Sequence, residues 1–125
     1  MNALGTHLLL ELQECDRELL NDLPYLRQTL IEAAEAVGAT VVGETFHQFS
    51  PHGITGVLAI AESHLCIHTW PEHAYAAVDI FTCGASFSPR KAAELLIQRL
   101  QARQHSIKEI KRGILSRPRV VSMAE

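Results

Sequence analysis

The chain is short of cysteine and of long apolar runs. Its three cysteines are odd in number and widely spaced, which argues against a disulfide framework and favours reduced thiols. No apolar run approaches the roughly 18 residues needed to span a bilayer. The leucine run at 8–10 also lacks the basic flank of a signal peptide. We therefore expect a cytoplasmic protein that does not bind membranes.

Positive charge is scarce as well. The chain has eleven Lys and Arg against fourteen Asp and Glu. It has no basic patch with interleaved aromatic residues, so we expect no nucleic-acid partner. Repeats and low-complexity segments are also missing. The 125 residues, 47% apolar and 20% charged, fit one globular domain over 1–125. Only the tail at 114–125 has the mixed composition of a loosely ordered segment.

Two segments carry the spacing and the start signals of helices. Asp22 followed by Pro24 predicts a helix that begins near residue 23, because aspartate caps helices and proline is tolerated in the first turn. Gly38 is well placed to end this helix. Ser88 and Pro89 predict the start of a second helix in the same way. Both segments have an apolar stripe at helical spacing, formed in the first by Leu26, Leu30, Ala33, Ala34 and Val37.

The remaining apolar segments are typical of strands, because β-branched and aromatic residues alternate with turn residues. We expect strands at 6–12, 40–49, 54–60, 65–70, 75–82 and 107–111. The resulting order predicts an α+β fold, a two-layer sandwich with an antiparallel sheet and both helices on one face. The other face then lacks a cover, so we expect a homodimer with four layers, αββα.

Residues 61–72 hold the densest cluster of reactive side chains. The segment contains a serine, two histidines, a cysteine and two carboxylates. Side chains on a strand alternate between faces, so one face would carry the polar set and the other the core set. The polar set is His64, Cys66, His68 and Trp70. Cys83 follows at the end of the next strand, where a thiol is well placed for chemistry.

Three interpretations of this cluster remain open from the residues alone. An ordinary strand with satisfied histidines and core cysteines is the commonest outcome for any one of them. A zinc site would use His64, Cys66 and His68, with Cys83 as a further ligand. Alternate residues on one strand are an unusual zinc spacing, however, and no C-x-x-C is present. A hydrolytic Ser–His pair would need a nucleophile elbow, and no G-x-S-x-G occurs.

The larger set of motifs resembles the small prokaryotic S-adenosylmethionine decarboxylases. The resemblance runs from about residue 4 to about residue 112. The segment 62–72 looks like the family's self-processing segment. The motifs that carry the resemblance are Leu4-Gly5-Thr6-His7-Leu8, Phe46-His47-Gln48-Phe49, Glu62-Ser63-His64-Leu65, Ile67-His68-Thr69-Trp70-Pro71-Glu72 and Phe81-Thr82-Cys83-Gly84.

The resemblance implies that the chain makes its own cofactor, a pyruvoyl group. The Ser63 hydroxyl would attack the carbonyl of Glu62 and turn the peptide bond into an ester. Loss of the Ser63 α-proton would eliminate that ester to dehydroalanine, and hydrolysis of the dehydroalanine, with release of ammonia, would leave a pyruvoyl group on residue 63. The chain would thereby split into 1–62, the β chain, and 63–125, the α chain. His68 matches the family's proton acceptor in this processing, a role that suits imidazole. Thr55 lies in the small-residue segment 53–56, which resembles the family's second processing element.

The resemblance also implies the reaction. The pyruvoyl group would form a Schiff base with S-adenosylmethionine, and Cys83 would return a proton after CO2 leaves. The product would be an aminopropyl donor for spermidine and other polyamines. Phe49 and Glu72 match the family's contacts to adenine and ribose, although Phe49 equally fits a core position. Trp70 is a further stacking candidate, and we expect no metal.

Three positions depart from the family pattern and leave alternatives open. Thr55 stands where serine is common, Cys66 replaces a usual threonine, and Thr6 replaces a frequent arginine. Relatives on the same scaffold decarboxylate arginine or ornithine, and these amino acids are the nearest alternative substrates. An alternative of another class is a homologue that is never processed and acts as a binding or regulatory partner.

Overall fold

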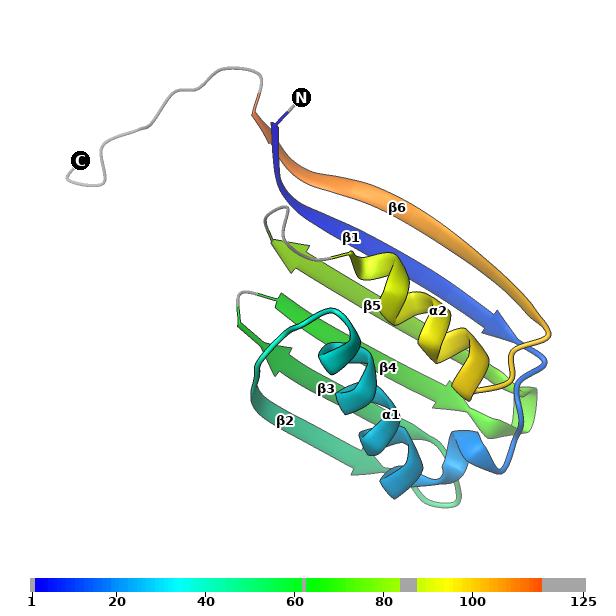
Figure 1. Cartoon of the computed structure of the whole chain (residues 1–125). Helices are drawn as coiled ribbons and strands as arrows, with labels where there is room; N and C mark the ends of the chain where they lie inside the picture. Colours follow the sequence, from blue (N-terminus) through cyan, green and yellow to red (C-terminus); the bar gives the residue numbers. More distant parts are fainter. Residues whose placement is uncertain (1, 62, 84–87, 116–125) are drawn as a thin grey trace.

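The computed structural model describes residues 2–61, 63–83 and 88–115. Its centre is one six-stranded sheet in the order β2-β3-β4-β5-β1-β6, in which all neighbouring strands are antiparallel (Figure 1). The strands are β1 (Asn2–Gln13), β2 (Val41–Gln48), β3 (Ile54–Ile60), β4 (Ser63–Trp70), β5 (Tyr75–Cys83) and β6 (Gln104–Leu115).

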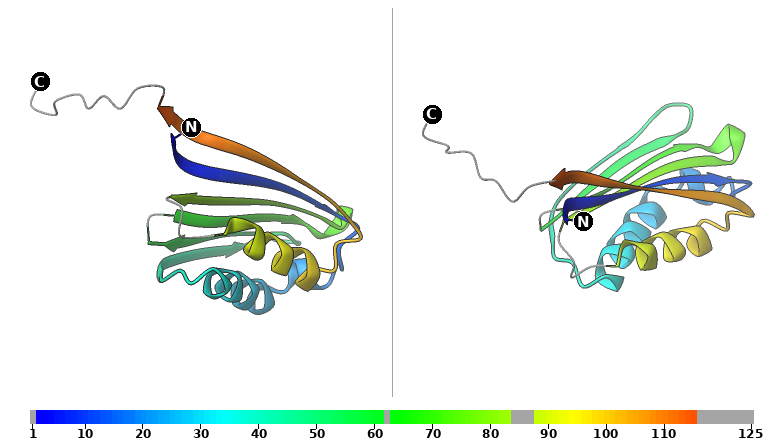
Figure 2. Two further views of the ribbon diagram at one scale, coloured as in Figure 1. Left: turned by 45° about the horizontal axis from the view of Figure 1, so that its top comes forward. Right: turned by 90° about the horizontal axis from the view of Figure 1, so that it is seen from above.

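Two helices, α1 (Leu23–Ala36) and α2 (Pro89–Arg99), lie side by side on one face of the sheet (Figure 2). The Asp22 side chain accepts a hydrogen bond from the Tyr25 amide at 3.1 Å, which confirms the predicted cap of α1. Ser88 stands at the N-cap of α2, but its hydroxyl makes no capping bond. The predicted two-layer α+β sandwich is confirmed.

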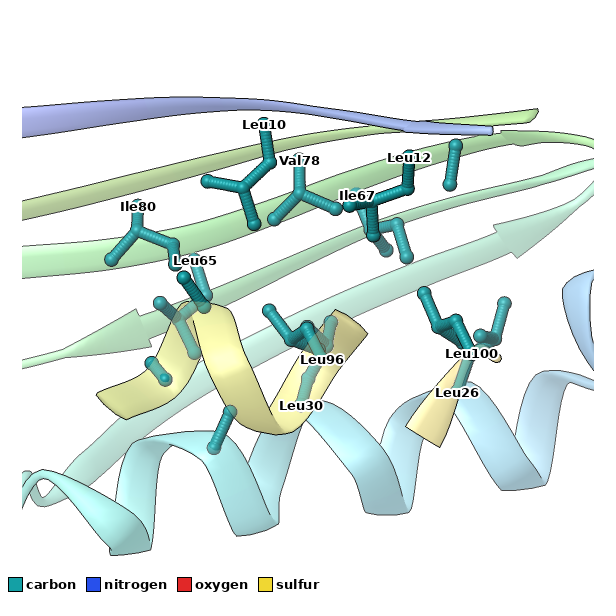
Figure 3. Close-up of a cluster of buried hydrophobic side chains, with 14 of the residues drawn as sticks. Leu10, Leu12, Leu26, Leu30, Leu65, Ile67, Val78, Ile80, Leu96 and Leu100 are labelled. Atoms are coloured by element: carbon teal, nitrogen blue, oxygen red, sulfur yellow. The ribbon is translucent and has the colours of Figure 1, made fainter. Parts of the chain in front are cut away.

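The core lies between the sheet and the helices (Figure 3). Leucine, isoleucine and valine side chains from β1, β4 and β5 point toward leucines of α1 and of the end of α2. Burying each large aliphatic side chain stabilises the fold by about 1.5–3 kcal/mol. The predicted alternation on β4 is confirmed, since Leu65, Ile67 and Thr69 are buried and their neighbours face the other side.

The two long strands β1 and β6 extend beyond their predicted limits. They pair from Gln13 and Gln104 at one end to Asn2 and Leu115 at the other. Backbone pairing with β1 therefore sets the length of β6, whose side chains are mostly exposed. The prediction of a loose tail is wrong at 114–115, which belong to β6, and residues 116–125 lie outside the described residues.

None of the residues that the structure describes forms a layer over the second face of the sheet. On it, β5 presents alternate half-buried side chains from Tyr75 to Cys83. Val57 and Trp70 on the same face are 37% and 40% exposed. We call this uncovered side of the sheet the open face.

Across the described ranges, no helix is long and apolar enough to cross a membrane.

Candidate functional site

Ser63 and Cys83 meet at one end of the sheet. Ser63 begins β4 and Cys83 ends β5, and pairing of His64 with Phe81 brings these two strand ends together. The Cys83 amide donates a hydrogen bond to Ser63 Oγ at 3.3 Å. The prediction that Cys83 ends its strand is confirmed. Glu62, the expected partner of Ser63 in cleavage, lies outside the described residues.

Two imidazoles and an aromatic ring line the open face beside this pair. The ring of His64 stacks on Phe81 at 5.6 Å, and His7 meets Phe81 edge-on at 5.7 Å. Arg112 Nη1 lies 3.3 Å from His7 Nδ1, and Asp79 Oδ1 lies 3.8 Å from His7 Nε2. Sequence reasoning assigned no role to His7, although its motif was among those that carried the resemblance.

Thr55 and His68 form a second pair further along the open face. They are direct neighbours in the β3–β4 ladder, and Thr55 Oγ1 lies 3.2 Å from His68 Nδ1. The ring of Trp70, the next open-face residue of β4, lies 6.5 Å from the ring of His68. These contacts bring together three of the residues predicted for the site.

A cavity of about 310 Å³ adjoins this second pair. Its volume is at the lower end of the range for small-molecule pockets. Phe49 is 49% exposed, so it is a cavity residue rather than a core residue. The lining residues include all three predicted substrate contacts, and they are Phe49, His52, Gly53, Thr55, His68, Thr69, Trp70 and Glu72.

Buried hydrogen bonds fix the floor of this cavity. Thr69 Oγ1 donates to the Leu20 carbonyl at 2.8 Å and accepts from the Ile54 amide at 2.9 Å. Asn21 Oδ1 accepts a bond of 3.0 Å from the Gly53 amide, which ties down the tip of the β2–β3 hairpin. The cavity wall is therefore held by a short turn, η1 (Leu19–Asn21), that sequence reasoning did not connect with the site.

The two pairs are far apart within one chain. Ser63 and His68 are five residues apart on β4, which is about 17 Å at roughly 3.3 Å per residue. A general base must lie within hydrogen-bond reach of its proton, about 3 Å. The structure thus brings Ser63 to Cys83 and His68 to Thr55, but it does not bring His68 to Ser63 of the same chain.

The electrostatic environment keeps two of the other polar groups on the sheet protonated. Burial, together with the negative charge of Asp79, raises the pKa of the Cys66 thiol. Burial and the hydrogen bond to Glu11 raise the pKa of Tyr75 to about 12, and its hydroxyl donates to that carboxylate at 2.8 Å. Cys66 is therefore a neutral thiol and Tyr75 a hydrogen-bond donor near pH 7.

The described residues form no cluster of side chains of the kind that a zinc site requires. Among the described residues, no three His, Cys, Asp or Glu side chains are grouped so that they could hold a metal ion. His64, Cys66 and His68 instead alternate along β4, and each has a different neighbour. His64 stacks on Phe81, Cys66 pairs with Asp79 in the β4–β5 ladder, and His68 contacts Thr55.

Fold and site together define a small α+β enzyme domain, with serine and cysteine at adjoining strand ends and imidazoles on an open sheet face. The sequence model described as S-adenosylmethionine decarboxylase matches residues 6–113. Because this match covers most of the chain, the protein belongs to the S-adenosylmethionine decarboxylase family.

Individual relatives agree with this assignment. The chain is 52% identical over 116 residues to an S-adenosylmethionine decarboxylase proenzyme of Thermodesulfovibrio yellowstonii, covering 93% of this chain and 86% of the relative. A proenzyme of the same name from Thermotoga maritima is 50% identical over 113 residues, covering 90% and 87%. The crystal structure of adenosylmethionine decarboxylase from Aquifex aeolicus superposes with a TM-score of 0.88 at 32% identity, covering 97% of this chain and 100% of that one.

Proposed function

We propose that the chain is a self-processing, pyruvoyl-dependent decarboxylase that converts S-adenosylmethionine to its decarboxylated form and CO2. The contact between Ser63 Oγ and the Cys83 amide is the observation that carries the proposal. The proposal is supported because the residue expected to become the cofactor contacts the backbone of the residue expected to donate the proton. Relatives about half identical to this chain are named as proenzymes of this activity.

Cleavage between Glu62 and Ser63 would begin with attack of Ser63 Oγ on the preceding carbonyl. Ser63 is half-buried and its hydroxyl is held by the Cys83 amide, so its position at the strand end is defined. A pyruvoyl group at residue 63 would supply an electron sink for decarboxylation. Cys83 would hold the proton that the product carbon receives, which requires a protonated thiol.

A second copy of the chain would complete each site. The separation of about 17 Å between Ser63 and His68 prevents either from serving the other within one chain. In the dimer that we propose, two copies pack open face to open face. They are related by a two-fold axis that runs between the two sheets and passes over β4 between Leu65 and Cys66. The β4 backbone at Ser63 of each copy then lies over the partner subunit's His68. This arrangement is the four-layer αββα homodimer, and it buries Val57 and Trp70.

In that dimer, His68 would act as the proton acceptor of processing. Thr55, 3.2 Å away, would hold its ring and stabilise the developing oxyanion. The cavity beside this pair suits a nucleoside, because it combines two aromatic side chains with a carboxylate. Phe49 and Trp70 would contact the base, and Glu72 the ribose hydroxyls.

The product would supply aminopropyl groups for spermidine, and we place the reaction in the cytoplasm. Cys83 is a free thiol in the structure. Its role in proton transfer requires it to remain reduced, as the cytoplasm ensures.

The test of the proposed function is CO2 release from S-adenosylmethionine, arginine and ornithine, assayed side by side. We expect turnover of S-adenosylmethionine alone, because neither amino acid has an aromatic base for the cavity to bind. Turnover of arginine or ornithine alone would overturn the substrate assignment. If none of the three compounds releases CO2 and the chain remains uncut, the result favours the alternative that the chain is never processed and acts as a binding or regulatory partner.

A further inference from the structure

His52 and Glu72 meet at the cavity from two different loops. His52 lies in the tip of the β2–β3 hairpin, and Glu72 lies in the short turn η2 (Pro71–His73) that follows β4. His52 Nε2 is 3.1 Å from Glu72 Oε1. Both residues line the cavity that also contains Phe49 and Trp70. The pair therefore connects the two walls of the expected nucleoside site.

The backbone that carries His52 is held in place independently of Glu72. The Phe49 amide donates to the Gly53 carbonyl at 2.8 Å, which closes the tip of the hairpin. The Gly53 amide in turn donates to Asn21 Oδ1 at 3.0 Å. His52 thus extends from a fixed turn, and removing its imidazole should leave the turn and the aromatic wall intact.

Glu72 has no comparable support. Within the described ranges, His52 is the only side chain that forms an ion pair or hydrogen bond with the Glu72 carboxylate. The two side chains are 38% and 41% exposed, so their pairing adds little to folding stability. Its consequence is orientation, because a contact at Oε1 limits rotation of a carboxylate that lines the cavity.

We infer that His52 is a positioning residue that orients the Glu72 carboxylate for the ribose hydroxyls and so sets the affinity for the nucleoside half of the substrate. The inference rests on the proposed function, since it takes that carboxylate as the ribose contact. It adds a residue at a turn position that neither the resemblance nor the strand pattern singled out.

Steady-state kinetics provide the first test. His52→Ala should raise KM for S-adenosylmethionine about 3- to 10-fold, as expected for the loss of a polar contact with a carboxylate at a partly exposed site. The value of kcat and the extent of self-cleavage should not change, because His52 touches neither Ser63 nor Cys83. His52→Gln keeps a donor and should restore most of the affinity. An unchanged KM in His52→Ala would overturn the inference.

Binding of a nucleoside without the amino-acid half gives a sharper test. The Kd of 5′-methylthioadenosine should rise in His52→Ala by the same factor as KM. The 2′-deoxy analogue lacks one of the hydroxyls that Glu72 would bind, so its Kd should hardly respond to the substitution. An equal loss of affinity for both nucleosides would show that His52 only shapes the turn, and would overturn the inference.

The two tests separate this inference from the proposed function. If the wild-type chain releases no CO2 but shows the hydroxyl-dependent effect of His52→Ala, the decarboxylase assignment fails and the role of His52 stands. If CO2 is released but the substitution affects both nucleosides equally, the assignment stands and the role of His52 fails.

Discussion

Thr55 and His68 face each other across the β3–β4 ladder, with Thr55 Oγ1 3.2 Å from His68 Nδ1. This contact determines which ring nitrogen is available for chemistry. If Nδ1 of His68 carries the ring proton, it donates a hydrogen bond to Thr55 Oγ1. The other ring nitrogen, Nε2, then has a free lone pair and can accept a proton. With that tautomer, the threonine hydroxyl would prepare His68 for the role of base proposed above.

Replacing Thr55 should slow self-cleavage. Thr55→Val keeps the shape of the side chain but removes the hydroxyl that contacts His68 Nδ1. We expect cleavage to slow by about 10-fold or more, followed as the loss of full-length chain with time after synthesis. Thr55→Ser is the matched control and should cleave at close to the wild-type rate. Equal rates for the valine and serine variants would remove Thr55 from processing.

Ser63→Ala should give one uncut chain that releases no CO2, because the alanine side chain has no nucleophilic oxygen. Intact mass measured directly after purification checks this expectation. Ser88→Ala is a suitable control, because that serine stands at a helix N-cap without making a capping bond. If the Ser63→Ala chain is still cut, Ser63 is not the nucleophile.

Cys83→Ala should separate processing from turnover. The variant keeps the amide that contacts Ser63 Oγ, so we expect fragments of the same size as in the wild type. Turnover should fall by about 100-fold or more, the usual contribution of a positioned acid. Cys66→Thr is the control on the neighbouring strand and should retain turnover. Full turnover in Cys83→Ala would assign the proton to another group.

Co-expression of two defective chains tests whether the site is shared between subunits. Ser63→Ala and His68→Ala should each remain uncut when expressed alone. In a mixed dimer, the His68→Ala chain has an intact Ser63 and meets the partner subunit's His68, so this chain should be cut. A distinguishing tag shows which chain is cleaved. If coexpression leaves both chains whole, the two-subunit site is wrong.

The helices and the buried strands were predictable from local signals. Asp22 and Pro24 mark the start of α1, and the apolar alternation through Leu65 and Ile67 assigns the two faces of β4. Such signals are strong because one face of each element is buried and the other is not. The half-buried face of His64, Cys66 and His68 was predicted for the same reason.

Other features depend on contacts between distant parts of the chain and were not predictable. β6 is mostly exposed, so only pairing with β1 reveals that it extends to Leu115. The connection of Asn21 to the hairpin tip joins residues 32 positions apart and leaves no periodic pattern. His52 belongs to a turn, where a histidine looks like an ordinary surface residue until its distance to Glu72 is known.

The central claim is that Ser63 becomes the cofactor of a decarboxylase, and intact-mass analysis of the purified chain tests it most directly. We predict two fragments, residues 1–62 with an ordinary carboxyl end and residues 63–125 with a pyruvoyl group in place of the amino-terminal serine. Borohydride reduction should add the mass of two hydrogens to the second fragment only. A single unmodified chain of 13.8 kDa would contradict the account.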